Sequence, residues 1–138
     1  MGIPWYGYRY ECIDPEFEPT MGKTCEIAQV PFRGVNCSDA AGTEIAYSGI
    51  RQIVNEGRNS SEVMRDSYMN VPFFNYVDNG TVYQIWYDDP ESLSAIYSWV
   101  IDEKLGGLGP YRWDQLDLAG NPAESQDMFK AIKDIARN

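Results

Sequence analysis

A buried β-strand near the start of the chain most constrains the fold. The run GIPWYGYRY at residues 2–10 is rich in aromatic and apolar residues, and a run of the same character, GLGPYRW, follows at 107–113. A helix is predicted between them, and two strands joined by a helical crossover pair in parallel with a right-handed connection. Because a parallel pair is normally covered on both faces, two such strands cannot form a stable sheet alone. The sequence therefore predicts an α/β fold that needs further strands.

The chain between these two strands contains further regular elements. An extended run is predicted at 25–32, and apolar residues recur at helical spacing over 47–55, with polar chain following to Asn70. At 71–89, two runs rich in aromatic and β-branched residues flank the tripeptide DNG at 78–80. Such a pattern is typical of a β-hairpin with a tight turn.

The crossover helix is predicted at 90–104. Asp89 can cap it, Pro90 suits its first position, and Gly106 or Gly107 is predicted to end it. Its predicted buried face consists of Leu93, Ile96, Tyr97, Val100 and Ile101.

A last helix is predicted at 122–136. Asn121 with Glu124 three residues later resembles a capping box at its start. Its predicted buried face consists of Met128, Phe129, Ile132 and Ile135.

The charge balance limits the possible partners. The 138 residues carry a net charge of −10 and include no His. Neutralising phosphates requires a basic face, so nucleic acid is excluded as a partner. Without His there is no imidazole acid–base chemistry and no His-ligated metal, and neither a metal nor a cofactor is predicted. No run of about 18 apolar residues occurs, so no membrane-spanning segment is predicted.

Three cysteines, Cys12, Cys25 and Cys37, lie in one early segment. Their wide spacing and the lack of His argue against a zinc site. One disulfide that leaves one free thiol is predicted. Cys12–Cys25 is the simplest pairing, and the other pairings stay open.

Glycosylation sequons occur at Asn36, Asn59 and Asn79. Together with the cysteines they favour a secreted or lysosomal protein. No signal peptide precedes them, so either the protein is cytosolic and the sequons are unused, or the native N-terminus is missing. We prefer the second interpretation, in which Met1 is an internal methionine or a gene-model start.

Four segments, GIPWYGYRYEC, VPFRGVNCSDAAG, YQIWYDDPESL and KLGGLG, occur in an order that resembles the C-terminal third of chitobiase-like members of glycoside hydrolase family 18. The resemblance implies that 2–10 and 107–113 are the seventh and eighth strands of a (β/α)8 TIM barrel. Residues 11–86 resemble an α+β subdomain inserted after the seventh strand, and 87–138 the last two helices and the final strand. A whole barrel needs about 250 residues. The chain, 1–138, is therefore predicted to be a C-terminal fragment that lacks the N-terminal barrel portion.

The resemblance also implies a reaction. Family members hydrolyse β-1,4 links between N-acetylglucosamine units by retaining, substrate-assisted catalysis, in which a glutamic acid of an Asp-x-x-Asp-x-Glu strand protonates the leaving oxygen. This motif is absent here. Asp114 and Asp117 match its first two positions, but Ala119 stands where the acid belongs. The chain alone is therefore predicted to be inactive.

The resemblance implies that this chain forms one wall of a sugar-binding pocket. Tyr6 matches the tyrosine of the family motif Pro-x-Tyr-Gly, and Tyr111 stands where members usually place a tryptophan as the pocket floor. Trp113 is expected two residues later on the same strand face. Sugar rings stack on aromatic side chains, and their hydroxyls bind phenol and guanidinium groups. The predicted oligosaccharide-binding residues are Tyr6, Tyr8, Arg9, Tyr111, Trp113 and Asp114.

Two alternatives stay open. Trp5, Tyr6 and Tyr8 can instead fill the barrel interior, since alternation places Tyr6 and Tyr8 on one strand face and Trp5 on the other. The chain can also be a non-catalytic glycan-binding or interaction protein built from a truncated barrel.

Overall fold

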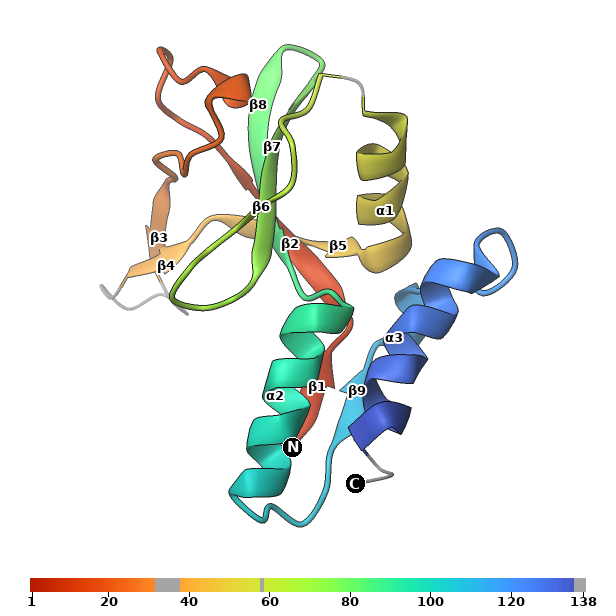
Figure 1. The fold of residues 1–138 in the computed structure, drawn as a ribbon. Coiled ribbons are helices and arrows are strands. Elements are labelled where there is room, and N and C mark those ends of the chain that lie inside the picture. Colours follow the sequence, from red (N-terminus) through yellow and green to blue (C-terminus); the bar gives the residue numbers. More distant parts are fainter. Residues whose placement is uncertain (32–37, 58, 136–138) are drawn as a thin grey trace.

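The computed structural model describes residues 1–31, 38–57 and 59–135. Its elements form two connected parts, an upper sheet with one helix and a lower pair of strands with two helices (Figure 1). The strands are β1 (Gly2–Pro4), β2 (Tyr6–Glu11), β3 (Gln29–Pro31), β4 (Ser38–Ala40), β5 (Gly42–Ala46), β6 (Met64–Arg65), β7 (Pro72–Asp78), β8 (Thr81–Tyr87) and β9 (Gly109–Tyr111). The helices are α1 (Tyr47–Glu56), α2 (Pro90–Asp102) and α3 (Pro122–Ile135), with short 3-10 turns at Pro19–Met21 and Trp113–Gln115.

The predicted parallel pair is confirmed, but both strands are shorter than predicted. β1 pairs in parallel with β9, with Ile3 opposite Pro110. β9 ends at Tyr111 because Arg112 takes a left-handed conformation, with φ of 63°. The run 2–10 is not one strand, since β1 ends at Pro4 and β2 enters a different sheet.

Trp5 lies at the break between β1 and β2 and is fully buried. Its backbone N–H donates to the Tyr111 carbonyl at 2.9 Å, which continues the parallel pairing by one residue. Its indole Nε1 donates to the Tyr97 hydroxyl at 3.0 Å, and its ring meets the Phe129 ring edge-on at 5.0 Å. Trp5 therefore belongs to the core under α2 and α3.

The second sheet has five strands in the order β5-β2-β8-β7-β6, and all its pairs are antiparallel. The predicted hairpin is confirmed as β7 and β8, with Asn79 and Gly80 in left-handed conformations at its tip. The edge strand β6 lies in the segment that was expected to be polar chain, and no element was predicted for the segment that forms the edge strand β5. The extended run predicted at 25–32 is only partly regular, since β3 covers Gln29–Pro31 and pairs with β4.

Helix α1, predicted from its periodicity, covers one face of the five-stranded sheet. Its Tyr47 and Ile50 are buried in a hydrophobic cluster with side chains of β7 and β8. Gly7 of β2 makes this approach possible, because a Cβ on Gly7 would lie 2.6 Å from Ile50 Cδ1 and 2.7 Å from the Trp86 carbonyl oxygen. The same cluster extends to Trp5 and to α2 and α3, so the two parts share one core.

Helix α2 begins as predicted and ends differently. The Asp89 side chain accepts the Ser92 N–H, and the Ser92 hydroxyl accepts the Asp89 N–H, which makes a reciprocal cap. The helix ends at Asp102, and the first residue after it with a positive φ is Lys104, ahead of Gly106 and Gly107. The predicted buried face is wrong at Ile101, which is 48% exposed.

Helix α3 begins with only half of the predicted capping box. The Asn121 side chain accepts the Glu124 N–H at 3.4 Å, but the Glu124 carboxylate binds Arg51 and Asn55 of α1 instead of the cap. Met128 is buried, and Phe129 and Ile132 pack against the core cluster as predicted. Among the described helices, none is both long and apolar enough to span a bilayer.

We predict that Gly7→Ala destabilises the chain. The new methyl group would collide with Ile50 and with backbone, so α1 or β2 must shift, and overpacking of this kind costs about 1–3 kcal/mol. The free energy of unfolding in urea measures the loss. Gly106→Ala is the matched control, because a Cβ there meets no atom within 4 Å. Equal stability of the two variants would contradict this account of how α1 packs.

Candidate functional site

The face of the five-stranded sheet opposite α1 carries a row of aromatic side chains. Alternation along β2 places Tyr6, Tyr8 and Tyr10 on this face. The Tyr6 and Tyr8 ring centres are 5.8 Å apart, and those of Tyr8 and Tyr10 are 6.2 Å apart and stacked. Trp86 of β8 lies opposite Tyr8 across the strands, and its ring stacks on Phe73 of β7 at 4.4 Å. The result is a continuous aromatic surface across three strands.

A cavity of about 510 Å³ opens over this surface, which is within the usual size range of small-molecule sites. Its floor includes Tyr6, Tyr8, Tyr10 and Trp86, and the loop carrying Thr24, Cys25 and Ile27 forms part of its wall. Met69 and Val71 close it on another side, and Asp88 is the one charged residue in the described lining. The cavity is therefore suited to a neutral ligand with apolar faces.

Three titratable groups of the cavity lining, Tyr6, Tyr87 and Asp88, have raised pKa values, and burial is the main cause for each. Burial raises the pKa of the Asp88 carboxyl, while the Ser92 hydroxyl, which donates to it at 2.8 Å, opposes that rise. Desolvation and then the neighbouring Tyr8 raise the pKa of the Tyr6 phenol. Tyr6 is thus a neutral hydrogen-bonding group at physiological pH, and Asp88 takes up a proton at a higher pH than an ordinary aspartate.

The structure brings some of the predicted site residues together. Tyr6 and Tyr8 line the cavity, and the Tyr111 ring lies 6.2 Å from the Tyr6 ring and is 58% exposed. Arg9 is on the opposite sheet face, where its guanidinium donates to the Tyr76 hydroxyl at 3.3 Å and covers the Tyr83 ring at 4.7 Å.

Trp113 was expected on the same strand face as Tyr111, and this is wrong. Both Trp113 and Asp114 lie beyond the end of β9. They follow Arg112 in a 3-10 turn, because the left-handed Arg112 redirects the chain. Asp114 accepts a hydrogen bond from Arg112 at 3.4 Å, and Arg112 also pairs with Glu44 of β5 at 2.9 Å. Neither Trp113 nor Asp114 is in the described lining of the cavity.

Tyr10 and Trp86 line the cavity, but neither was among the site residues predicted from the sequence. Tyr10 has a clear signal in the sequence, since it continues the alternation of Tyr6 and Tyr8. Trp86 has a weaker signal, because alternation along the predicted hairpin groups it with Gln84 but does not show which sheet face is open. Only the pairing of β8 with β2 places Trp86 beside Tyr8.

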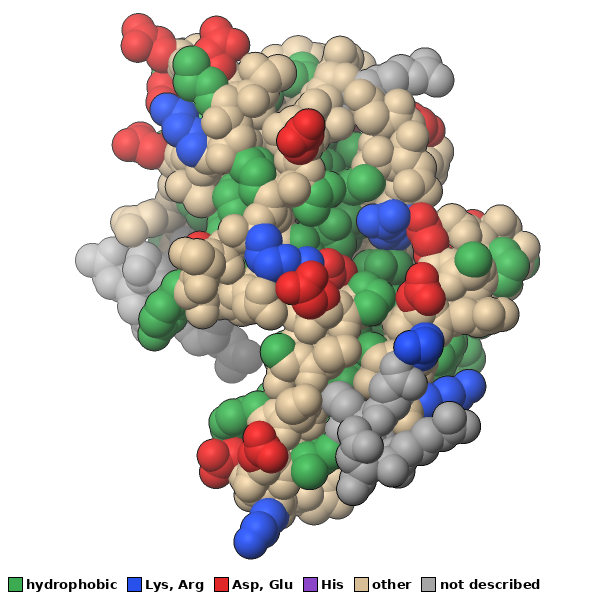
Figure 2. Space-filling model, in the orientation of Figure 1, with side chains coloured by type: hydrophobic (Ala, Val, Ile, Leu, Met, Phe, Trp, Pro, Cys, Tyr) green, Lys and Arg blue, Asp and Glu red, His purple; other side chains and the backbone are tan. Residues whose placement is uncertain are grey.

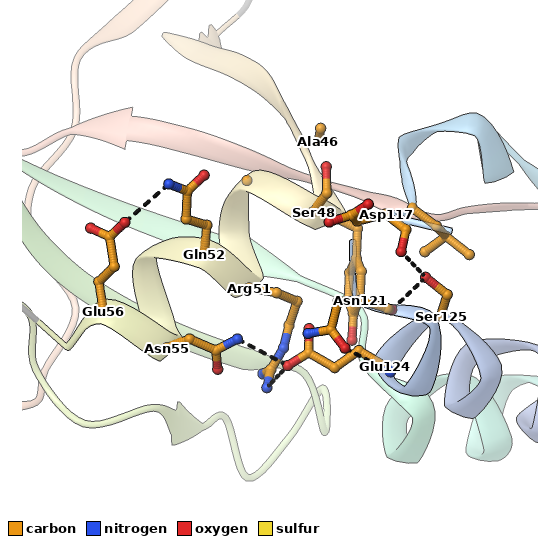
Figure 3. A pocket seen from close by; sticks show the side chains of 13 residues that line it. Ala46, Ser48, Arg51, Gln52, Asn55, Glu56, Asp117, Asn121, Glu124 and Ser125 are labelled. Carbon is orange, nitrogen blue, oxygen red and sulfur yellow. Dashed lines mark hydrogen bonds and ion pairs between the residues drawn. The ribbon is translucent and has the colours of Figure 1, made fainter. Parts of the chain in front are cut away.

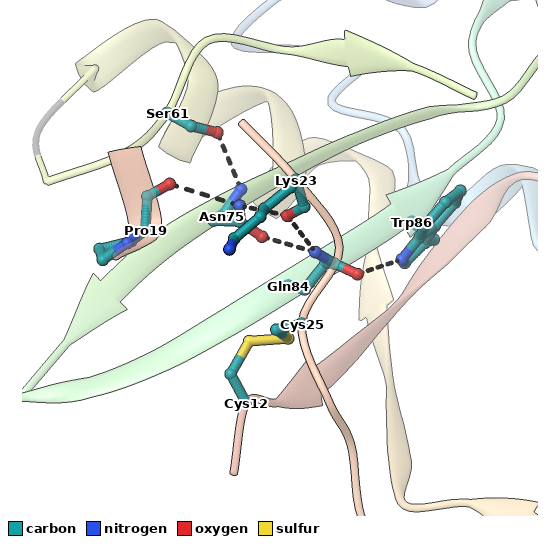
Figure 4. Close-up of a disulfide and its surroundings, with 8 residues drawn as sticks. All are labelled: Cys12, Pro19, Lys23, Cys25, Ser61, Asn75, Gln84 and Trp86. Atoms are coloured by element: carbon teal, nitrogen blue, oxygen red, sulfur yellow. Dashed lines mark hydrogen bonds between the residues drawn. A yellow bond between two sulfur atoms is a disulfide. The ribbon is translucent and has the colours of Figure 1, made fainter. Parts of the chain in front are cut away.

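The Cys12–Cys25 disulfide is confirmed (Figure 4), and its Cys25 lines the cavity. It closes the loop that follows β2 and fixes Cys25 at the cavity wall. Asn59 and Asn79 are exposed, as glycosylation would require, and the Asn59 carbonyl accepts the Val77 N–H near the tip of the β7–β8 hairpin. Asn36 and Cys37 lie outside the described residues.

A second cavity, of about 650 Å³, lies between α1 and the start of α3 (Figure 3). Its polar side chains mainly bind one another. Arg51 donates to the Glu124 carboxylate at 3.0 Å, Asn55 donates to the same oxygen at 3.1 Å, and Gln52 donates to Glu56 at 3.0 Å. The Arg51 hydrogen bond is the main cause of a lowered Glu124 pKa. We interpret this cavity as a junction that joins the two parts of the chain.

Acidic groups are scattered over the visible face of the molecule, and several lie beside basic groups (Figure 2). Within 1–31, 38–57 and 59–135, no group of three or more Cys, Asp or Glu side chains is arranged to hold a metal ion. The aromatic cavity is the stronger candidate site of the two, because the polar side chains of the second cavity mainly bind one another.

Curated relatives match almost the whole chain. It is 34% identical over 137 residues to human di-N-acetylchitobiase, and 39% identical over 136 residues to the probable di-N-acetylchitobiase 2 of Dictyostelium discoideum. Both matches cover 96% of this chain but only 34% and 35% of the relatives. The chain thus spans about a third of the length of the relatives it matches. No protein-family model matches it.

Solved structures share the fold. A Group IV chitinase of Ostrinia furnacalis superposes on all of this chain with a TM-score of 0.69 at 18% identity, over 35% of that chain. Human YKL-39, described as a pseudo-chitinase with retained chitooligosaccharide binding, superposes on all of this chain with a TM-score of 0.67 at 20% identity, again over 35% of its length.

We predict that Glu124→Gln lowers stability at neutral pH and has little effect in acid. A carboxyl whose pKa is lowered on folding stabilises the protein above its unfolded pKa of about 4.3, and this contribution is lost as the pH falls through the lower folded value. Urea unfolding of both proteins from neutral pH down to about 3 measures the difference. Glu62→Gln, which changes an exposed glutamate, controls for the loss of one charge. A stability difference between Glu124→Gln and the wild-type chain that is independent of pH would contradict the prediction.

Proposed function

We propose that this chain, which is related in sequence to the di-N-acetylchitobiases, is one portion of a glycosidase that hydrolyses β-1,4-linked N-acetylglucosamine units. The observation that carries the proposal is the aromatic cavity at the end of the parallel β1–β9 pair, in a chain that matches its relatives over 96% of its length. The relatives are named for action on chitobiose, and the chitinase neighbours share the fold.

The parallel pair supports a place in a larger barrel. β1 pairs with β9 alone among the described strands, so each has a second edge without a strand partner. A parallel pair is normally buried on both faces and extended by further strands. We propose that these are the seventh and eighth strands of a (β/α)8 barrel, with α2 and α3 as its last helices, and that the missing N-terminal portion supplies the rest.

The position of the cavity agrees with such a barrel. Sites of these barrels lie at the C-terminal ends of the strands. β1 ends at Pro4 and β9 ends at Tyr111, so Tyr6 and Tyr111 lie at that end of both strands. The insert first proposed for 11–86 then forms the upper sheet. Its strands include β2, so the antiparallel pairing begins at Tyr6.

In the proposed reaction, this chain binds and does not cleave. Retaining hydrolysis assisted by the substrate acetamide needs a glutamic acid on an Asp-x-x-Asp-x-Glu strand, which is absent from this chain. The tyrosine phenols offer hydrogen bonds and stacking faces to the sugar. The disulfide and the exposed Asn59 and Asn79 support a lysosomal or secreted location for the whole protein.

A second function is favoured by one observation. The cavity floor is built entirely from this chain, which permits glycan binding without any barrel partner. A non-catalytic glycan-binding protein is therefore the alternative, and YKL-39 shows that chitooligosaccharide binding occurs in a protein described as a pseudo-chitinase.

We expect the purified chain to release no fluorophore from a fluorogenic chitobioside above the buffer rate, at acidic and at neutral pH. The reason is that no proton donor stands at the position of the motif glutamate. Turnover that is lost on Asp88→Asn would contradict this prediction and place the acid within the cavity.

We expect the chain to bind N-acetylglucosamine oligosaccharides and Tyr8→Ala to weaken that binding by about tenfold, the loss of one stacking contact. Isothermal titration calorimetry measures both affinities. Tyr8→Phe keeps the ring and is the matched control, expected to bind more tightly than Tyr8→Ala. Absence of saturable binding to the wild-type chain would refute the binding role.

A further inference from the structure

Trp86 lies where a ligand in the cavity would meet it. It is half-buried, it lines the cavity, and it faces the same side of the sheet as Tyr8, its neighbour across the strands. One face of its ring is covered by Phe73, at 4.4 Å and an angle of 12° between the planes. The opposite ring face is therefore the one that can meet a ligand.

The orientation of the Trp86 ring is fixed by a hydrogen bond. Its indole Nε1 donates to the Gln84 side-chain carbonyl at 2.9 Å (Figure 4). Gln84 is itself 3% exposed, so this acceptor is not shared with bulk water. The bond and the stacking on Phe73 together hold the indole in one position.

Gln84 is held in turn by a network of side-chain amides in which every N–H group donates a hydrogen bond. Its Nε2 donates to the Asn75 side-chain carbonyl at 2.7 Å and to the Lys23 backbone carbonyl at 3.2 Å. The Asn75 amide donates to the backbone carbonyls of Lys23, at 3.0 Å, and Pro19, at 3.3 Å. Because both N–H groups of each amide are bonded, neither amide has a donor left for a ligand. A satisfied buried network of this kind is rigid.

We propose that Trp86 is a sugar-stacking residue of the cavity and that Gln84 is its positioning residue. This inference rests on the proposed function, because it takes the ligand to be an N-acetylglucosamine oligosaccharide. A pyranose ring is neutral and has an apolar face, which fits an indole held flat against Phe73 in a lining with little charge. Trp86 thereby extends the tyrosine surface of β2 onto β8, and the ligand is held across two strands.

The test uses the indole N–H resonances of the 15N-labelled chain, which has four tryptophans. Single Trp→Phe variants assign the resonances, and N,N′-diacetylchitobiose and chitotriose are the ligands. We expect the Trp86 resonance to shift saturably with ligand, while those of buried Trp5 and of Trp99 on α2 do not move. Trp86→Phe should weaken binding by about tenfold and Trp99→Phe, its matched control, should leave affinity unchanged.

Gln84→Met tests the positioning role. It keeps a long side chain but removes the acceptor of the Trp86 indole, so the Trp86 resonance should move in the free protein and the affinity should fall. Unchanged resonance and affinity would overturn the role of Gln84.

Two outcomes separate this inference from the proposed function. Saturable binding with an unmoved Trp86 resonance, and with Trp86→Phe within twofold of wild type, would overturn the inference alone. No saturable binding by the wild-type chain would overturn both.

Discussion

The burial of Trp5 joins the two parts of this molecule. Its backbone continues the β1–β9 pairing through Tyr111, and its indole reaches Tyr97 of α2. The next residue, Tyr6, already belongs to the five-stranded sheet. Trp5 thus holds the aromatic row of β2 against the parallel pair, together with the shared core and the Arg51–Glu124 contact. The position of the cavity at the strand ends depends on that connection.

Most local features of this fold could be predicted from the sequence, whereas of the long-range strand pairings only the parallel β1–β9 pair was predicted. The β7–β8 hairpin and the start of α2 follow from residues close in sequence, Asn79–Gly80 and Asp89–Pro90, and both predictions are confirmed. The break at Trp5 depends on where β9 ends, which the left-handed Arg112 decides. No sequence pattern around Trp5 or around Arg112 indicates the break or the left-handed conformation. β5 and β6 were missed because each is a short edge strand, stabilised by its neighbour rather than by its own composition.

The same division applies to the candidate site. Alternation correctly grouped Tyr6 with Tyr8 and set Trp5 apart, and the simplest cysteine pairing, Cys12–Cys25, is the one found. Arg9 was grouped with the tyrosines by proximity in sequence, although the period of two places it on the other face, against Tyr76 and Tyr83. Trp86 enters the site only through strand pairing. The surface that a ligand would touch is therefore a product of sheet topology more than of any motif.

The wall segment Lys23–Cys25 is attached to the molecule in two chemically independent ways. A covalent bond ties Cys25 to the end of β2, and the amides of Asn75 and Gln84 bind the Lys23 carbonyl. A loop anchored at both of its ends can change length between them at small entropic cost, because loop-closure entropy grows only slowly with length. The exposed residues after Ile13 are thus where insertions in related chains can reshape the mouth of the cavity while its aromatic floor stays in place.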